Sequence, residues 1–335
     1  MITLDRFRSD WDNRSAAAGV RGIGPVGKGT GGGVCQRAFG KPKALMEEVL
    51  TVGYLYLIVH IAGTVSFGHI MKWALRRRCE LAAVGAVNYA VASSMSLLFA
   101  LILGSAGLSV SAIATGILGG LSYVVSFFFY AQAMRLTGVS ISTAVVRLSM
   151  LPAVLASVLI WGERPGLIQV VGMVLVFASL PLLSQQPGDK TVPLRGEVWH
   201  WLLAVFVTTS GGYLAARLFQ EVGSPAAKPL LLSVWFGVSA LVGAFYLRVQ
   251  RLAPRPADLP LGIVLGAANV IGNFALLAAL ESLPGAIVFP VSTAGGLVLT
   301  ILTSAALWRE KLSRPALAGV LMAVPALVLM NLPKA

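Results

Sequence analysis

The chain contains ten long apolar segments joined by short connectors, a pattern that excludes most ways of folding in water. The segments have about 19 to 26 residues, the length that an α-helix needs to cross about 30 Å of hydrocarbon at about 1.5 Å per residue. The predicted spans are 49–73, 81–103, 109–134, 140–161, 166–184, 197–219, 227–248, 259–282, 285–308 and 314–332. The sequence therefore predicts an all-α integral membrane protein with ten transmembrane helices.

The composition points to lipid as the main solvent of the chain. Hydrophobic residues make up 57% of the 335 residues and charged residues 12%, with a mean hydropathy of +0.82, whereas a soluble domain has roughly a quarter charged residues. The net charge of +13 would suit a nucleic-acid binder. However, eight of the 26 Lys and Arg residues lie in the first 43 residues and most others flank apolar runs, where anionic lipid headgroups attract them. We therefore expect a lipid bilayer, and no nucleic acid, as a partner.

The residues that usually carry catalysis or bind metals are few and scattered. Cys35 and Cys79 make neither a disulfide framework nor a metal-ligand spacing. His60, His69 and His200 are far apart, and none has a carboxylate at helical i+3 or i+4 spacing. The sequence thus predicts no enzyme, no cofactor, no metal and no catalytic residue.

Residues 1–45 form a basic tail rich in Gly, Arg, Ser and Lys. Its apolar content is too low to build a core, so we expect this tail to be disordered. Met46 precedes Glu47, Glu48 and the first apolar run, which makes it a plausible alternative start and the tail a candidate gene-model extension.

The chain repeats itself at an offset of 147 residues, which aligns 119–182 with 266–329 without gaps. The matched pairs are Gly119 with Gly266, Phe127 with Phe274, Gly138 with Gly285, Trp161 with Trp308, Glu163 with Glu310, and Gly172 with Gly319. We expect a first five-helix repeat over 46–185 and a second over 196–333. Because five is an odd number of crossings, the second repeat must be inverted in the bilayer, an architecture that supports alternating access.

Motifs in both halves resemble the drug/metabolite transporter superfamily, specifically its duplicated EamA type. The residues that carry the resemblance are Tyr130, Ala131, Gln132, Ala133, Met134, Gly138, Pro152, Trp161, Gly162, Glu163 and Gly172, echoed by Ala278, Gly285, Trp308, Arg309, Glu310 and Gly319. The resemblance implies ten helices, inverted repeats and solute transport, often export or exchange driven by a proton or a counter-solute. Arg309 stands where the family more often has Gly, so the repeats have diverged.

The resemblance names no substrate, and several functions stay open. We expect a multi-pass protein of a bacterial-type inner membrane that transports a small-molecule substrate, anionic or amino-acid-like. The alternatives are a multidrug exporter of the same fold and a non-transporting sensor or scaffold. Coupling to a proton or a counter-solute and assembly as a homodimer are also left open.

Arg147 is the sharpest candidate for substrate binding, because it lies seven residues into the fourth predicted span. An ionisable group in hydrocarbon is costly unless it is paired or hydrated. Its guanidinium could bind a carboxylate or a phosphate through two hydrogen bonds. The alternative is a structural pair with Glu281 or with a helix carbonyl.

Two polar pairs at i, i+4 spacing occupy equivalent positions of the two repeats. Ser122 and Ser126 lie on the third span, and Asn269 and Asn273 on the eighth. They are candidate substrate ligands that face each other across the pseudo-twofold axis, with hydrogen bonds between packed helices as the alternative. Weaker candidates are Asn88, Tyr89, Tyr130 and Trp235.

A Trp-x-Glu motif recurs at the ends of the fourth and ninth spans, as Trp161 with Glu163 and Trp308 with Glu310. We expect each glutamate to accept hydrogen bonds from the amides that open the next helix. Proton coupling by these glutamates is the alternative.

Pro152 and Pro290 lie inside predicted helices, where each removes one backbone hydrogen bond. They are candidate kinks or hinges for gating.

The orientation in the membrane is left open. The family resemblance places both termini in the cytoplasm. Lys and Arg residues instead number thirteen in the loops opposite the termini and four on the termini side outside the tail, a distribution that favours termini outside.

Overall fold

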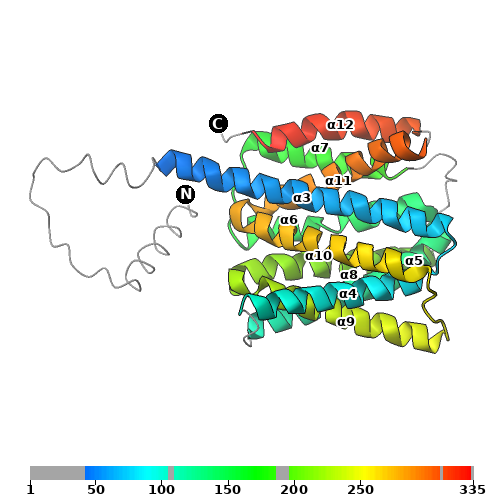
Figure 1. Cartoon of the computed structure of the whole chain (residues 1–335). Helices are drawn as coiled ribbons and strands as arrows, with labels where there is room; N and C mark the ends of the chain where they lie inside the picture. Colours follow the sequence, from blue (N-terminus) through cyan, green and yellow to red (C-terminus); the bar gives the residue numbers. More distant parts are fainter. Residues whose placement is uncertain (1–41, 105–108, 186–195, 310–311, 333–335) are drawn as a thin grey trace, which may run out of the picture. The chain divides into compact units, whose positions relative to one another are not determined.

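The structure, a computed structural model, describes residues 42–104, 109–185, 196–309 and 312–332. Residues 1–48 and 49–335 form separate units, and the following concerns the second. The elements are α3 (Pro42–Arg76), α4 (Leu81–Ile102), α5 (Val110–Leu148), α6 (Leu151–Leu159), α7 (Leu167–Leu183), α8 (Gly196–Val222), a 3-10 turn η1 (Pro225–Ala227), α9 (Lys228–Val249), α10 (Asp258–Ser282), α11 (Gly285–Trp308) and α12 (Arg314–Met330). The described residues are thus all-α, as predicted (Figure 1).

The helix bounds modify one prediction at the start of the chain. Helix α3 begins at Pro42, so residues 42–45, which we predicted as part of the disordered tail, are helical. The remainder of the predicted tail, residues 1–41, lies outside the described residues.

Apolar helices of membrane-spanning length account for the fold class. Eight described segments are long and apolar enough to cross a bilayer, and the two remaining apolar helices, α7 and α12, have 17 residues each. Large apolar side chains also lie on the outer surface, such as Val110 and Leu167, which are 80% and 81% exposed. Such side chains suit contact with lipid rather than with water. The chain is a multi-pass integral membrane protein.

Helix α5 contains a chain reversal that the sequence located only approximately. The Tyr130 hydroxyl lies 2.9 Å from the Thr143 hydroxyl, although 13 residues of straight helix would separate them by about 20 Å. The chain therefore turns back between these residues. The predicted crossings 109–134 and 140–161 correspond to Val110–Met134 and Ile141–Leu159. The predicted connector 135–139, however, is helical, and the second crossing is divided between the end of α5 and α6.

The two five-helix repeats recur at the predicted offset and are inverted. Helices α4 and α9 differ by 147 residues at both ends, as do α7 and α12. Helices α7 and α12 pack against each other through equivalent glycines. A Cβ on Gly172 would lie 2.7 Å from the Cγ of Met330, and one on Gly319 would lie 2.9 Å from the Cγ of Leu183. Each contact is the 147-residue counterpart of the other, so a pseudo-twofold axis passes between two antiparallel helices.

The same symmetry relates the inner helices. Gly119 of α5 packs against the Trp235 ring of α9, and Gly266 of α10 packs against α4, where an added Cβ would lie 2.8 Å from the carbonyl oxygen of Asn88. Small residues thus allow close helix contacts, which is how helices associate in lipid. Asn88 and Trp235 are equivalent in the two repeats, so one repeat places an amide where the other places an indole.

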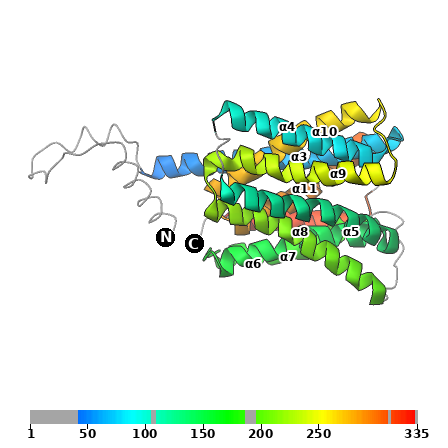
Figure 2. The ribbon, with the colours of Figure 1, turned by 90° about the horizontal axis from the view of Figure 1, so that it is seen from below.

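The apolar helices lie roughly side by side and run between two ends of one bundle (Figures 1 and 2). Gly53 at the start of the first crossing packs against Leu283, which directly follows α10. Near the start of α7, Gln169 Nε2 donates a hydrogen bond of 3.2 Å to the carbonyl of Leu332, which follows α12. We call this end, where the first crossing begins and α12 finishes, the terminal end, and the other the opposite end.

The contact between α7 and α12 predicts that Gly172→Leu will destabilise the protein. The added side chain would collide with Met330 and with the backbone of α12, and overpacking costs about 1–3 kcal/mol. We expect a lower melting temperature of the purified protein in detergent. Val174→Leu, on the exposed face of the same helix, should leave it unchanged. Equal melting temperatures for both variants would contradict this packing.

Candidate functional site

A ladder of three amides joins α4 to α10 between the two repeats. Asn269 Nδ2 donates to Asn88 Oδ1 at 3.2 Å, and Asn273 Nδ2 donates to Asn269 Oδ1 at 2.7 Å. Asn273 Nδ2 also lies 2.9 Å from the backbone carbonyl of Asn269. Asn88 is 1% exposed, whereas Asn273 is half-buried. The ladder thus runs from the packed interior toward a less buried position.

Aromatic side chains from both repeats surround this ladder. Tyr123 of α5 makes edge contacts with Tyr89 of α4 and Trp235 of α9, with ring centroids 5.8 Å and 6.5 Å apart. Tyr123 also lies close to the side chain of Asn269. We call the three amides and three rings the amide–aromatic cluster. It can offer hydrogen bonds and flat ring surfaces to a solute.

Arg147 lies near the end of α5, is half-buried and has no carboxylate partner among the described residues. Its Nε is shielded from solvent and has no hydrogen-bond partner. The alternative that it pairs with Glu281 is wrong, because Glu281 Oε2 lies 2.7 Å from Lys228 Nζ. Arg217 and Lys228 form salt bridges with carboxylates, whereas Arg147 forms none with a described residue. Its charge is therefore available to an anion.

His60 connects Arg147 with the amide ladder. It lies on α3, where its Nδ1 is 2.8 Å from the carbonyl oxygen of Gly272, the residue before Asn273. The close approach of α3 and α10 depends on Gly63, where an added Cβ would lie 3.1 Å from Gly272 Cα. Arg147 lies near enough to His60 for its charge to act on the imidazole. Arg147, His60 and the ladder therefore share one region between the repeats.

The structure brings only part of the predicted polar face together. Asn269 and Asn273 join the ladder with Asn88, but Ser122 packs against Gly211 of α8. The Ser126 hydroxyl donates to the carbonyl of Tyr123 in its own helix, at 2.8 Å. Tyr123, one residue after Ser122, is the α5 residue that meets the asparagines. The predicted facing of serines and asparagines is therefore wrong by one position on the α5 side.

Tyr130 lies away from this region. Its hydroxyl bonds to Thr143 beside the reversal of α5, and its ring packs with Ala133, Val198 and Leu202 at the opposite end. This position gives Tyr130 a packing role in the reversal.

Glu163 caps a helix, but not the helix that we predicted. Its Oε1 and Oε2 accept hydrogen bonds from the backbone amides of Gly285 and Ala286, at 2.9 and 2.8 Å. These amides open α11 in the second repeat, whereas α7 is the next helix in the chain. A helix N-terminus favours a carboxylate through its free amides and its dipole, whichever segment supplies the carboxylate.

The two tryptophans of the repeated motif each carry an arginine over the ring. The Cζ of Arg217 lies 4.6 Å from the ring centroid of Trp161, and that of Arg76 lies 4.1 Å from the centroid of Trp308. The Trp308 Nε1 also donates to His69 Nδ1 at 2.9 Å. Glu310, the glutamate of the second copy of the motif, lies outside the described residues.

The two prolines occupy different kinds of position. Pro152 lies in the first turn of α6, directly after a break at Ser149 and Met150, so it begins a helix rather than interrupting one. The Ser210 hydroxyl of α8 donates to the Ser149 carbonyl at this break, at 2.8 Å. Pro290 lies inside α11 and is buried. The break supplies a place where the second crossing can bend.

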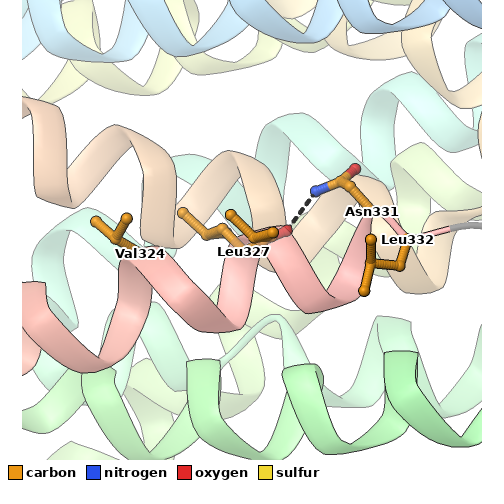
Figure 3. A pocket seen from close by; sticks show the side chains of 5 residues that line it. Val324, Leu327, Asn331 and Leu332 are labelled. Atoms are coloured by element: carbon orange, nitrogen blue, oxygen red, sulfur yellow. Dashed lines mark hydrogen bonds between the residues drawn. The ribbon is translucent and has the colours of Figure 1, made fainter.

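A hollow on the outside of α12 is not a solute site (Figure 3). It has a volume of about 470 Å³ and is lined by Val324, Leu327, Val328, Asn331 and Leu332. The Asn331 amide donates to the carbonyl of Leu327 in its own helix, at 2.6 Å. The hollow offers aliphatic surface at the exposed, lipid-facing side of the helix.

Sequence reasoning did not select Tyr123, His60 or Arg217. The spacing of Arg217 and Glu221 at i, i+4 inside an apolar span was a signal, since such a pair can hold a charge in a helix. Tyr123 and His60 carried no comparable local signal. Their importance comes from partners 146 and 212 residues away in the chain.

Taken together, inverted helical repeats around a polar region define a multi-pass membrane protein of the transporter class. The profile of the EamA-like transporter family matches residues 51–185, so this part of the chain is an EamA-like domain and the expected family resemblance is confirmed. The match is consistent with the drug/metabolite transporter superfamily. Members of this family are membrane transporters of small solutes and not, in general, enzymes.

Two further comparisons agree with this assignment. An uncharacterized protein of Haemophilus influenzae is 28% identical over 206 residues, which cover 60% of this chain and 69% of that protein. A solved crystal structure superposes with a TM-score of 0.68 over 85% of this chain and 96% of that chain. Its sequence identity of 16% makes the likeness one of fold alone.

The amide ladder predicts that Asn269→Ala will destabilise the protein, because Asn88 and Asn273 would lose their shared partner in a buried position. A buried polar group without a partner costs about 1–3 kcal/mol. We expect a lower melting temperature in detergent. The matched change Asn331→Ala, at an exposed amide bonded to its own helix, should have little effect. Equal melting temperatures would argue against the ladder.

Proposed function

We propose that the protein is a secondary transporter that moves a small anionic metabolite across a bacterial-type inner membrane by alternating access. The solute would be a compound with a carboxylate or a phosphate group, and an amino-acid-like molecule is included in this class. Transport would be export or exchange, driven by a proton or a counter-solute.

The observation that carries the proposal is the uncompensated charge of Arg147. A cation within a membrane-spanning bundle is costly unless a counter-charge or water stabilises it. Arg147 lacks a carboxylate partner among the described residues, and its Nε is unpaired. A carboxylate or a phosphate would neutralise its charge and accept its hydrogen bonds.

The neighbouring groups suit a solute that has a polar body as well as a negative charge. The half-buried Asn273 and Tyr123 are amphipathic or polar groups next to the region of Arg147 and His60. In binding sites, a few such groups fix the orientation of a ligand, and ring surfaces supply contact area. The inverted repeats supply the mechanism, because two related halves can exchange conformations around a central site.

The alternative of a multidrug exporter has one observation in its favour, which is the edge contacts among Tyr89, Tyr123 and Trp235. Such rings bind flat apolar or cationic molecules. Arg147 opposes this alternative for cationic drugs, because it would repel them. The same experiment therefore separates the two.

Replacing Arg147 should abolish most of the transport of an anionic solute. We expect Arg147→Ala in liposomes to lower flux of a labelled anionic metabolite about tenfold to hundredfold at subsaturating concentration, because a hydrogen-bonded charge contributes about 1.5–3 kcal/mol. Arg147→Lys should retain part of the activity, since it keeps the charge but loses the planar geometry.

The matched control is Arg248→Ala, which removes an exposed arginine from the last turn of α9 and should leave flux unchanged. Undiminished anion flux in Arg147→Ala would refute the anionic site. If the protein transports cationic drugs and Arg147→Ala leaves this flux intact or increases it, the multidrug alternative is favoured. If the wild-type protein transports no solute in the screen, the result favours a sensor or scaffold.

A further inference from the structure

Glu163 joins the two repeats at the terminal end of the bundle. It follows α6 in the first repeat, and both carboxylate oxygens bind the amides that open α11 in the second repeat. The approach is close, because a Cβ on Gly285 would lie 2.6 Å from the Ser157 hydroxyl of α6. The carboxylate therefore bridges two helices at a point where Gly285 packs directly against the Ser157 side chain.

Arg217 of α8 completes this junction. It is 7% exposed although it lies within a membrane-spanning segment. Its Nη2 is 3.1 Å from Glu163 Oε1, its Nη1 is 2.6 Å from Glu221 Oε1, and its Nε donates to the Ser157 hydroxyl at 3.1 Å. The guanidinium also lies over the Trp161 ring. One cation is thus held by two carboxylates, a hydroxyl and an indole.

Burial along α11 indicates that the bundle is closed at this end. All fourteen residues from Gly285 to Val298 are buried. The residues from Leu299 to Trp308, toward the opposite end, are half-buried or exposed. The neighbouring helices therefore enclose α11 over the half nearer the terminal end and cover it less toward the opposite end.

We propose that Glu163, Arg217 and Glu221 form an ionic latch, together with the amides of Gly285 and Ala286, that closes the solute path at the terminal end and must open in each transport cycle. The cyclic opening rests on the proposed function, because alternating access requires each end to open in turn. The closed latch itself rests on the contacts above.

The energetics of buried ion pairs explain why this junction can control the conformation. Two charges that are paired and hydrogen-bonded in a dry junction separate only if water or another partner replaces the lost contacts. Because Glu163 belongs to one repeat and both Arg217 and α11 to the other, separation of the repeats at this end breaks the ion pair of Glu163 and both of its bonds to the α11 amides together. The latch therefore sets the ratio of closed to open molecules.

A second ion pair at the same end provides a matched control. Lys228 Nζ lies 2.7 Å from Glu281 Oε2. Lys228 begins α9 and Glu281 lies in the last turn of α10, so both belong to the second repeat. Removal of this pair deletes a similar interaction without releasing one repeat from the other.

The test measures the separation of the repeats with spin labels, in protein whose Cys35 and Cys79 are replaced by serine. Labels at Ile160 of the first repeat and Val222 of the second, 73% and 55% exposed, report this distance by double electron–electron resonance in lipid nanodiscs. Glu163→Gln should increase the ratio of long-distance to short-distance molecules about tenfold, because removal of one partner of a buried pair is strongly destabilising. Glu221→Gln should produce a smaller increase, and Glu281→Gln none.

Size-exclusion chromatography identifies variants that do not fold, and Glu221→Gln, which keeps the Glu163 contacts, decides the outcome if Glu163→Gln is lost. Wild-type distance distributions in both Glu163→Gln and Glu221→Gln, or an equal shift in Glu281→Gln, would overturn the latch. No solute is needed for this measurement. Absence of flux in the wild-type protein would therefore refute transport and leave the latch standing.

Discussion

The absence of water from the hydrocarbon region is the constraint on which the rest of this structure depends. Backbone amides and carbonyls must find partners within the chain, so every crossing is helical. Lipid also provides no hydrophobic force that would drive helices together, so close packing between them carries much of the association. The glycines at the α7–α12, α5–α9 and α4–α10 contacts meet this need, because a side chain at Gly172 or Gly266 would collide with the facing helix.

The same constraint explains where polar groups are tolerated. Asn88, Asn269 and Asn273 satisfy one another, and Arg217 is surrounded by carboxylates and a hydroxyl. Arg147 departs from this rule, since its Nε has no partner. Two buried hydroxyls, of Ser96 and Thr209, also have no partner among the described residues, but Arg147 is the charged group among these three. An unpaired buried charge points to function, because a ligand can pair with it.

The two repeats are symmetric in their helix packing but differ in the residues between them. The equivalent glycines of α7 and α12 preserve the pseudo-twofold packing that alternating access requires. The inner positions have diverged: Asn88 corresponds to Trp235, and Ser122 to Asn269. Packing between the helices thus retains the symmetry of the repeats, while the region between the repeats has become chemically asymmetric.

The sequence by itself determined the crossings, the inverted repeat and the family, because apolar length, repeat offset and short motifs are local properties of the chain. It also selected Arg147 and the asparagines, since polar groups within apolar spans are visible without a fold. Only the tertiary structure decided the partners: Glu163 caps α11 rather than α7, Tyr123 replaces Ser122 beside the asparagines, and Glu281 pairs with Lys228. These choices depend on how helices distant in the chain rotate and cross, and the periodicity of a single helix does not specify its neighbours.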